Sequence, residues 1–76
     1  MTPEQRGDRA RNLLNDDVLK DALDMIEKDC LDQWRATSFR DADAREKLWM
    51  QLKAIDILKA KLQQAVADGQ IARNLK

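Results

Sequence analysis

The chain has 76 residues, of which 43% are hydrophobic, 37% are charged and only 4% are aromatic. Fourteen Lys and Arg residues balance fourteen Asp and Glu residues, which argues against a general nucleic-acid binder with a basic surface. The sequence contains no His, the commonest general base and metal ligand, and no apolar run approaches the ~18 residues that a membrane span needs.

The sequence predicts a short first helix at about residues 3–14. Thr2 and Gln5 have the spacing of a capping box, in which each side chain bonds the other residue's backbone N–H. Gly7 weakens this helix, whose length is near the ~12-residue limit for isolated helices. We expect it either to pack on the rest of the chain through the leucines at its end or to fray.

A second helix is predicted at about residues 17–36, capped by either Asn15 or Asp16. Its apolar residues recur at helical spacing on one face: Leu19, Leu23, Ile26, Cys30 and Trp34. Three further residues widen this stripe on one side: Val18, Ala22 and Met25. Residues 15–35 hold seven acids and three bases, so the outer surface of this helix is expected to be acidic.

A polar break follows, and a third helix is predicted at about residues 43–68. Two capping-box patterns compete for its start, one beginning at Ser38 and one at Asp43, which leaves its first residue open by several positions. The apolar stripe of this helix consists of Leu48, Leu52, Ile55, Leu58, Leu62, Ala65 and Val66. Its basic cluster, Lys53, Lys59 and Lys61, is expected to lie on a solvated face.

The third helix is expected to end at Gly69, a residue type that readily adopts the left-handed conformation of a helix C-cap. Residues 69–76 are then a tail, in which Ile71 and Leu75 either tuck against the helices or dock on a partner. The two long stripes together predict an all-α fold with a single domain at residues 1–76: a long antiparallel helical hairpin preceded by a short N-terminal helix. Because an elongated hairpin leaves the apolar residues on its sides exposed to solvent, we expect it to assemble into a helical bundle, most simply with a second copy of itself.

The residues that enzymes use are missing or misplaced. Gly7 and Gly69 are too far apart for a phosphate-binding loop, and Ser38 has no His to activate it. The carboxylates of the second helix face away from its apolar stripe, so they do not form an inward metal site. The only cysteine, Cys30, lies on the stripe and reads as a small buried hydrophobe in a reducing compartment. We therefore expect no catalytic residue, no cofactor and no metal.

The three aromatic residues, Trp34, Phe39 and Trp49, lie near the turn of the predicted hairpin. One interpretation is an aromatic plug that closes the seam, and the other is that one tryptophan stays exposed as an interface anchor. Trp49 is favoured for the second role, because it directly follows Leu48 and both cannot occupy the centre of one narrow seam. The candidate partner interface consists of Trp49, Trp34, Phe39, Met25 and Val18.

The chain also resembles a family of small helical proteins from tailed bacteriophages and prophages, which are often encoded near head and packaging genes. The resemblance is carried by residues spread over most of the chain: Arg9, Ala10, Leu13 to Asp16, Trp34, Thr37, Arg45, Glu46, Leu48, Trp49, Leu52, Leu62, Gly69, Ile71 and Ala72. That family has no established activity. The resemblance implies a role in virion assembly or as a phage accessory protein, in the cytoplasm of the bacterial host or in the virion.

Three functions follow as hypotheses. The first is a non-enzymatic structural protein that acts through self-association, with virion assembly as the role that the resemblance implies. The second is an accessory protein that regulates a phage or host protein by binding it through the acidic helix, at Asp21, Asp24 and Asp32. The third, which has the least support, is nucleic-acid binding through the mildly basic ends of the chain. None of them involves a membrane.

Overall fold

The computed structural model of the chain describes residues 1–75, and every regular element within them is an α-helix. The elements are α1 (Pro3–Leu14), α2 (Asp17–Ala36) and α3 (Ala42–Asn74). The all-α prediction is confirmed, and the predicted bounds of α1 and α2 agree with the structure. The third helix begins one residue earlier than predicted and runs six residues further.

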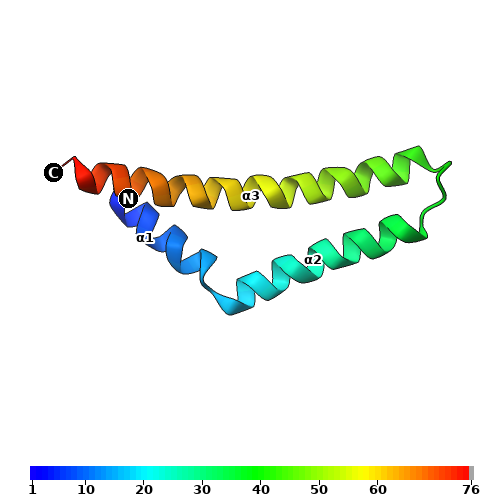
Figure 1. Cartoon of the computed structure of the whole chain (residues 1–76), viewed down its shortest axis with the longest axis horizontal. Helices are drawn as coiled ribbons and strands as arrows, with labels where there is room; N and C mark the ends of the chain where they lie inside the picture. Colours follow the sequence, from blue (N-terminus) through cyan, green and yellow to red (C-terminus); the bar gives the residue numbers. More distant parts are fainter. Residues whose placement is uncertain (76) are drawn as a thin grey trace.

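Figure 1 shows the helices as a flattened triangle in which α3 is the long side. The chain bends sharply between α1 and α2, and α2 then converges on the beginning of α3 to form the predicted antiparallel hairpin (Figure 1). The molecule measures 56 × 22 × 16 Å, with a radius of gyration of 16.5 Å. A compact domain of this length would have a radius of gyration of about 11 Å, so the fold is elongated.

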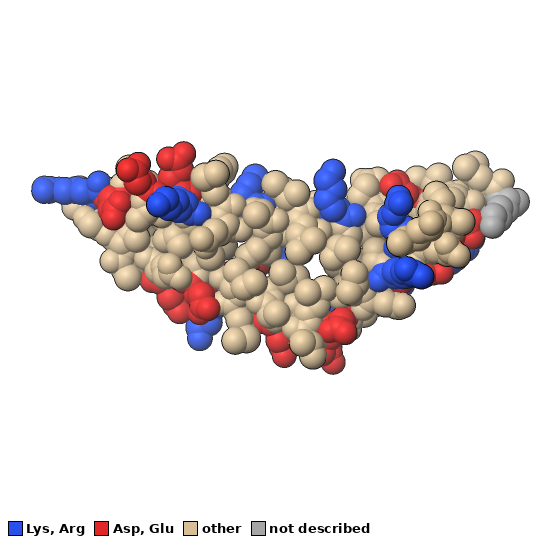
Figure 2. All heavy atoms as spheres, turned by 180° about the vertical axis from the view of Figure 1, so that it is seen from behind, with Lys and Arg blue, Asp and Glu red and all other residues tan. Residues whose placement is uncertain are grey.

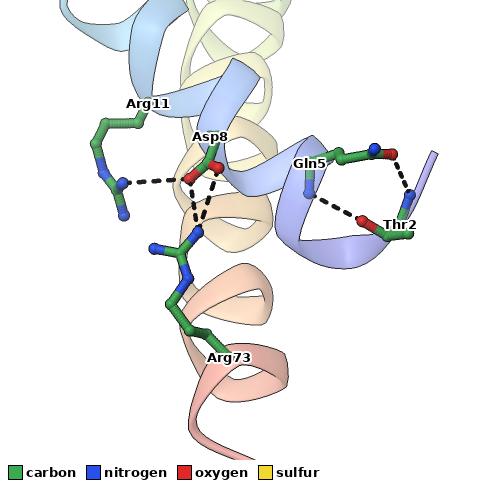
Figure 3. A network of polar contacts seen from close by, with 5 residues as sticks. All are labelled: Thr2, Gln5, Asp8, Arg11 and Arg73. Carbon is green, nitrogen blue, oxygen red and sulfur yellow. Dashed lines mark hydrogen bonds and ion pairs between the residues drawn. The ribbon is translucent and has the colours of Figure 1, made fainter. Parts of the chain in front are cut away.

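Side-chain caps set the starts of all three helices. Thr2 and Gln5 form the predicted capping box, with N–H to oxygen distances of 3.0 and 3.1 Å (Figure 3). Asp16, and not Asn15, caps α2 by accepting from the Leu19 N–H at 2.9 Å. The cap of α3 is Asp41, which accepts from the Ala44 N–H at 3.1 Å, so neither pattern predicted for this start is the one used.

The prediction that the third helix ends at residue 68 with Gly69 as a left-handed cap is wrong. Both glycines have negative φ, and α3 continues through Gly69 to Asn74, so most of the predicted tail is helical. Gly69 is required by packing instead. A Cβ built on it would lie 3.1 Å from the Gly7 Cα and 3.0 Å from the Pro3 carbonyl oxygen. Lys76, the last residue of the predicted tail, lies outside the described residues.

Helix α1 packs on α3 backbone against backbone. A Cβ built on Gly7 would lie 3.0 Å from both the Gly69 Cα and the Ala65 carbonyl oxygen. Ala10, one turn further on, is buried in the same contact region. The first helix therefore docks rather than frays, and its small residues make the closest contact. Of the two leucines at its end, Leu13 is exposed and Leu14 is half-buried.

The buried core is thin. Among the described residues, five apolar side chains are buried: Ala10, Leu23, Cys30, Leu48 and Ile55. The accessible surface is 6035 Å², whereas a compact monomer of this mass exposes about 4,800 Å². The predicted stripes do face each other, but the hairpin buries only part of them.

Candidate interaction surface

Polar contacts close one side of the seam between α2 and α3. The Lys59 ammonium of α3 donates to the Glu27 carboxylate of α2 at 2.6 Å. This hydrogen bond, with help from the Glu27 charge, raises the pKa of Lys59 above 10.5. Nearer the turn, the guanidinium of Arg45 lies 4.3 Å from the centre of the Trp34 ring. The expectation that Lys53, Lys59 and Lys61 lie on a solvated face is therefore wrong for Lys59, which is half-buried in the seam, while the other two are exposed.

The opposite side of the seam is apolar and uncovered. Ile26 and Leu58 each stand one residue before a member of the ion pair, which is about 100° round the helix. Since α2 and α3 are antiparallel, this rotation brings both residues out on the side away from the ion pair. They are 47% and 45% exposed, although both belong to the stripes predicted from the sequence.

Further apolar residues extend this surface along both helices. On α2, Val18 and Met25 are 78% and 65% exposed. Ala22 and Ile26 follow Val18 at intervals of four residues, and Met25, about 100° round the helix from Ile26, stands at the outer margin of this surface. We call the whole surface the apolar face, and its members are Val18, Ala22, Met25, Ile26, Ala54 and Leu58. Seen from behind, the middle of the hairpin is largely uncharged; the lower edge carries mostly Asp and Glu, and the upper edge carries charges of both signs (Figure 2).

The structure divides the five predicted interface residues among three places. Val18 and Met25 lie on the apolar face. Trp34 is half-buried beneath Arg45, and its carbonyl accepts from the Thr37 hydroxyl at 2.6 Å.

The other two predicted residues, Phe39 and Trp49, are 77% and 56% exposed, so the aromatic plug does not form. Phe39 lies in the turn, under the Arg40 guanidinium at 5.4 Å. Trp49 directly follows buried Leu48, so it lies about 100° round α3 from the seam, on the side of the Lys59–Glu27 ion pair. The Lys53 ammonium lies 5.9 Å from the centre of the Trp49 ring. The predicted residues are thus accessible in four cases of five, but they do not form one patch.

A groove of about 250 Å³ opens at the bend between α1 and α2. Five leucines from all three helices line it: Leu13, Leu14, Leu19, Leu23 and Leu62. Charged side chains, among them Lys20 and Asp24, stand at its edge. The groove exists because α1 and α2 diverge from α3 at this point (Figure 1).

Ion pairs also tie the ends of the fold together. The Arg73 guanidinium donates to both carboxylate oxygens of Asp8, at 3.1 and 3.2 Å, and Arg11 lies 3.5 Å from the same carboxylate (Figure 3). These side chains are about half exposed, so the contact orients α1 on α3 more than it stabilises it.

The described part of the chain offers few residues that could bind a metal or react chemically. No three His, Cys, Asp or Glu side chains within it are grouped as a metal site. Cys30 is buried as predicted, and its Sγ donates to the Gln51 side-chain oxygen at 3.2 Å. In the same part of the chain, no helix combines the length and the apolar character that crossing a bilayer requires.

Comparison with known proteins gives no match to a protein family, to a characterised protein or to a solved structure. The resemblance to phage proteins is therefore still a prediction.

Proposed function

We propose that this chain is a structural or interaction protein that acts by self-association into a helical bundle and not by catalysis. One observation carries the proposal. The folded chain exposes 6035 Å², about 1,200 Å² more than a compact monomer of its size. In a standard protein interface each partner contributes about 800 Å², so the excess is large enough for one such contact.

The composition of this excess surface supports the same proposal. Within residues 1–75, thirteen large apolar side chains are exposed and only five apolar residues are buried. A helix that is apolar on several sides belongs inside a larger assembly. The core that one chain leaves incomplete would be completed by another.

Sedimentation equilibrium of the purified chain, from about 1 μM to about 100 μM, tests the proposal. We expect a mass of at least twice the monomer's 8.8 kDa, reached within this range. A chain that is fully helical by circular dichroism and remains monomeric at every concentration would overturn it.

The other hypotheses stay predictions. The acidic residues assigned to a regulatory contact, Asp21, Asp24 and Asp32, are exposed, which keeps that role open. If the phage resemblance holds, the proposed assembly belongs to the virion or to the cytoplasm of the bacterial host.

A further inference from the structure

We propose that the apolar face is the surface on which a second copy of the chain docks, with α2 of each copy lying over α3 of the other. This inference rests on the self-association proposed above and adds the surface, the partner and the orientation. The apolar face is the broad side of a hairpin and not its edge, so two copies stacked on it form a four-helix bundle around a shared core.

The two sides of the seam differ in the free-energy cost of covering them with a partner. On one side, the Lys59–Glu27 ion pair already satisfies its own polar groups, and covering it would remove charges from water. On the other, Ile26 and Leu58 are about half exposed directly beside the buried core. Covering them extends an apolar core that exists already, which is the less costly association.

The charges of the two helices favour a second copy of this chain as the partner. Helix α2 has six acids and three bases, whereas α3 has four acids and six bases. In a twofold dimer with α2 over the partner's α3, the acidic helix of each copy attracts the more basic helix of the other. The attraction occurs twice, because an isologous contact repeats each interaction. Placing α2 over the partner's α2 would instead bring two acidic helices together.

The apolar face itself carries charges of both signs at its margins. Asp29 is four residues after Met25 on α2, while Lys47 and Lys61 each stand seven residues from Ala54 on α3. All three are exposed, and no ion pair within residues 1–75 involves them. They are therefore free to pair across a contact in which α2 meets the partner's α3.

Matched substitutions test the surface. Ile26 lies on the apolar face, and Ile57 lies about 200° round α3 from buried Ile55, on the outer edge, with nearly the same exposure. We expect Ile26→Lys to raise the dimer dissociation constant at least about tenfold, and Ile57→Lys to change it less than about twofold. Leu58→Lys, at the matching position of α3 on the same face, should act like Ile26→Lys and serves if Ile26→Lys lowers the helix content.

A charge reversal tests the orientation. Asp29→Lys should weaken the dimer if α2 lies over the partner's α3, and it should strengthen the dimer if α2 lies over α2, which would overturn the orientation. If the unchanged chain associates but only Ile57→Lys disrupts it, the surface is wrong and the proposed function stands. If the unchanged chain is monomeric, the proposed function itself fails.

Discussion

At the scale of single residues, three basic side chains hold α3 in alignment with the other two helices. The residues of α3 that meet α1 and α2 alternate at intervals of three and four: Arg45, Leu48, Leu52, Ile55, Lys59, Leu62, Val66, Gly69 and Arg73. The basic members recur every 14 residues, about 21 Å apart along the axis, and each has a different counterpart: Trp34, Glu27 and Asp8. A polar residue inside an apolar seam is known to select one register of paired helices.

The Lys59–Glu27 pair gives the stability of the fold a defined pH dependence. The folded pKa of Lys59 lies above the unfolded value of 10.5, because of the hydrogen bond to Glu27. Its contribution is therefore complete below pH 10.5 and is lost as the pH rises through the folded pKa. We expect Lys59→Met to be less stable than the unchanged chain at about pH 8, and the difference to shrink at about pH 11.

Urea unfolding at the two pH values measures this difference at a fixed protein concentration. Lys61→Met, at an exposed position two residues on, is the control and should show a small difference at both. A gap between Lys59→Met and the unchanged chain that is the same at both pH values would contradict the assignment.

The exposed half of the seam shows what sequence patterns leave out at this scale. Periodicity placed Ile26 and Leu58 on the inner stripes, which is nearly right, because both border the seam. They are exposed because the contact across the seam is made by the next residue of each helix, in the ion pair between Glu27 and Lys59. A favourable contact between residues 32 positions apart has no signature in local spacing.

At the scale of helices, the main difference from expectation is that α3 runs through Gly69. Glycine at the end of an apolar stripe is typical of a helix C-cap, and the local sequence alone favours that interpretation. A glycine is needed at position 69 because the backbone of α1 at Gly7, 62 residues earlier, approaches the backbone of α3 too closely for a side chain. The caps of α1 and α2, in contrast, are made within four residues: the sequence predicted the first, and it narrowed the second to Asn15 or Asp16.

Replacing Gly69 by alanine tests this contact, because helix propensity and packing predict opposite signs. In an open helix the change stabilises by up to about 1 kcal/mol. Here the new Cβ would meet backbone atoms of α1 at 3.0 and 3.1 Å. We expect Gly69→Ala to lower the free energy of unfolding by about 1 kcal/mol, the usual range for a mild overpacking, and to speed amide hydrogen exchange in α1.

Chemical denaturation and hydrogen exchange of the variant give both quantities. Gln70→Ala, at the exposed neighbouring position, should be neutral or slightly stabilising. A Gly69→Ala chain more stable than the unchanged one would show that α1 and α3 do not approach closely.

At the scale of the whole molecule, the hairpin and its order of helices could be predicted, because two long stripes separated by one polar break leave few other arrangements. The triangular outline could not. It arises at the bend between α1 and α2, where α1 has run away from α3 and the helix capped by Asp16 turns the chain back towards it (Figure 1). The result is a flat molecule with two unlike sides and an unfinished core.

An unfinished core makes thermal stability depend on concentration. If association buries the apolar face, mass action stabilises the folded chain as its concentration rises. We expect the midpoint of thermal unfolding to rise by several degrees over a hundredfold increase in concentration, and to rise less in Ile26→Lys. Circular dichroism melts measure this, and a midpoint independent of concentration would argue against association through this face.

The contact between Gly7 and Gly69 also has a topological consequence. It brings the beginning of α1 onto the end of α3, so the path of the backbone nearly returns to its origin (Figure 1). A backbone of this kind is close to a ring with one gap, and the turn at residues 37–41 is a second place where such a ring could be opened. The arrangement of the three helices is therefore separable from the order in which the chain connects them.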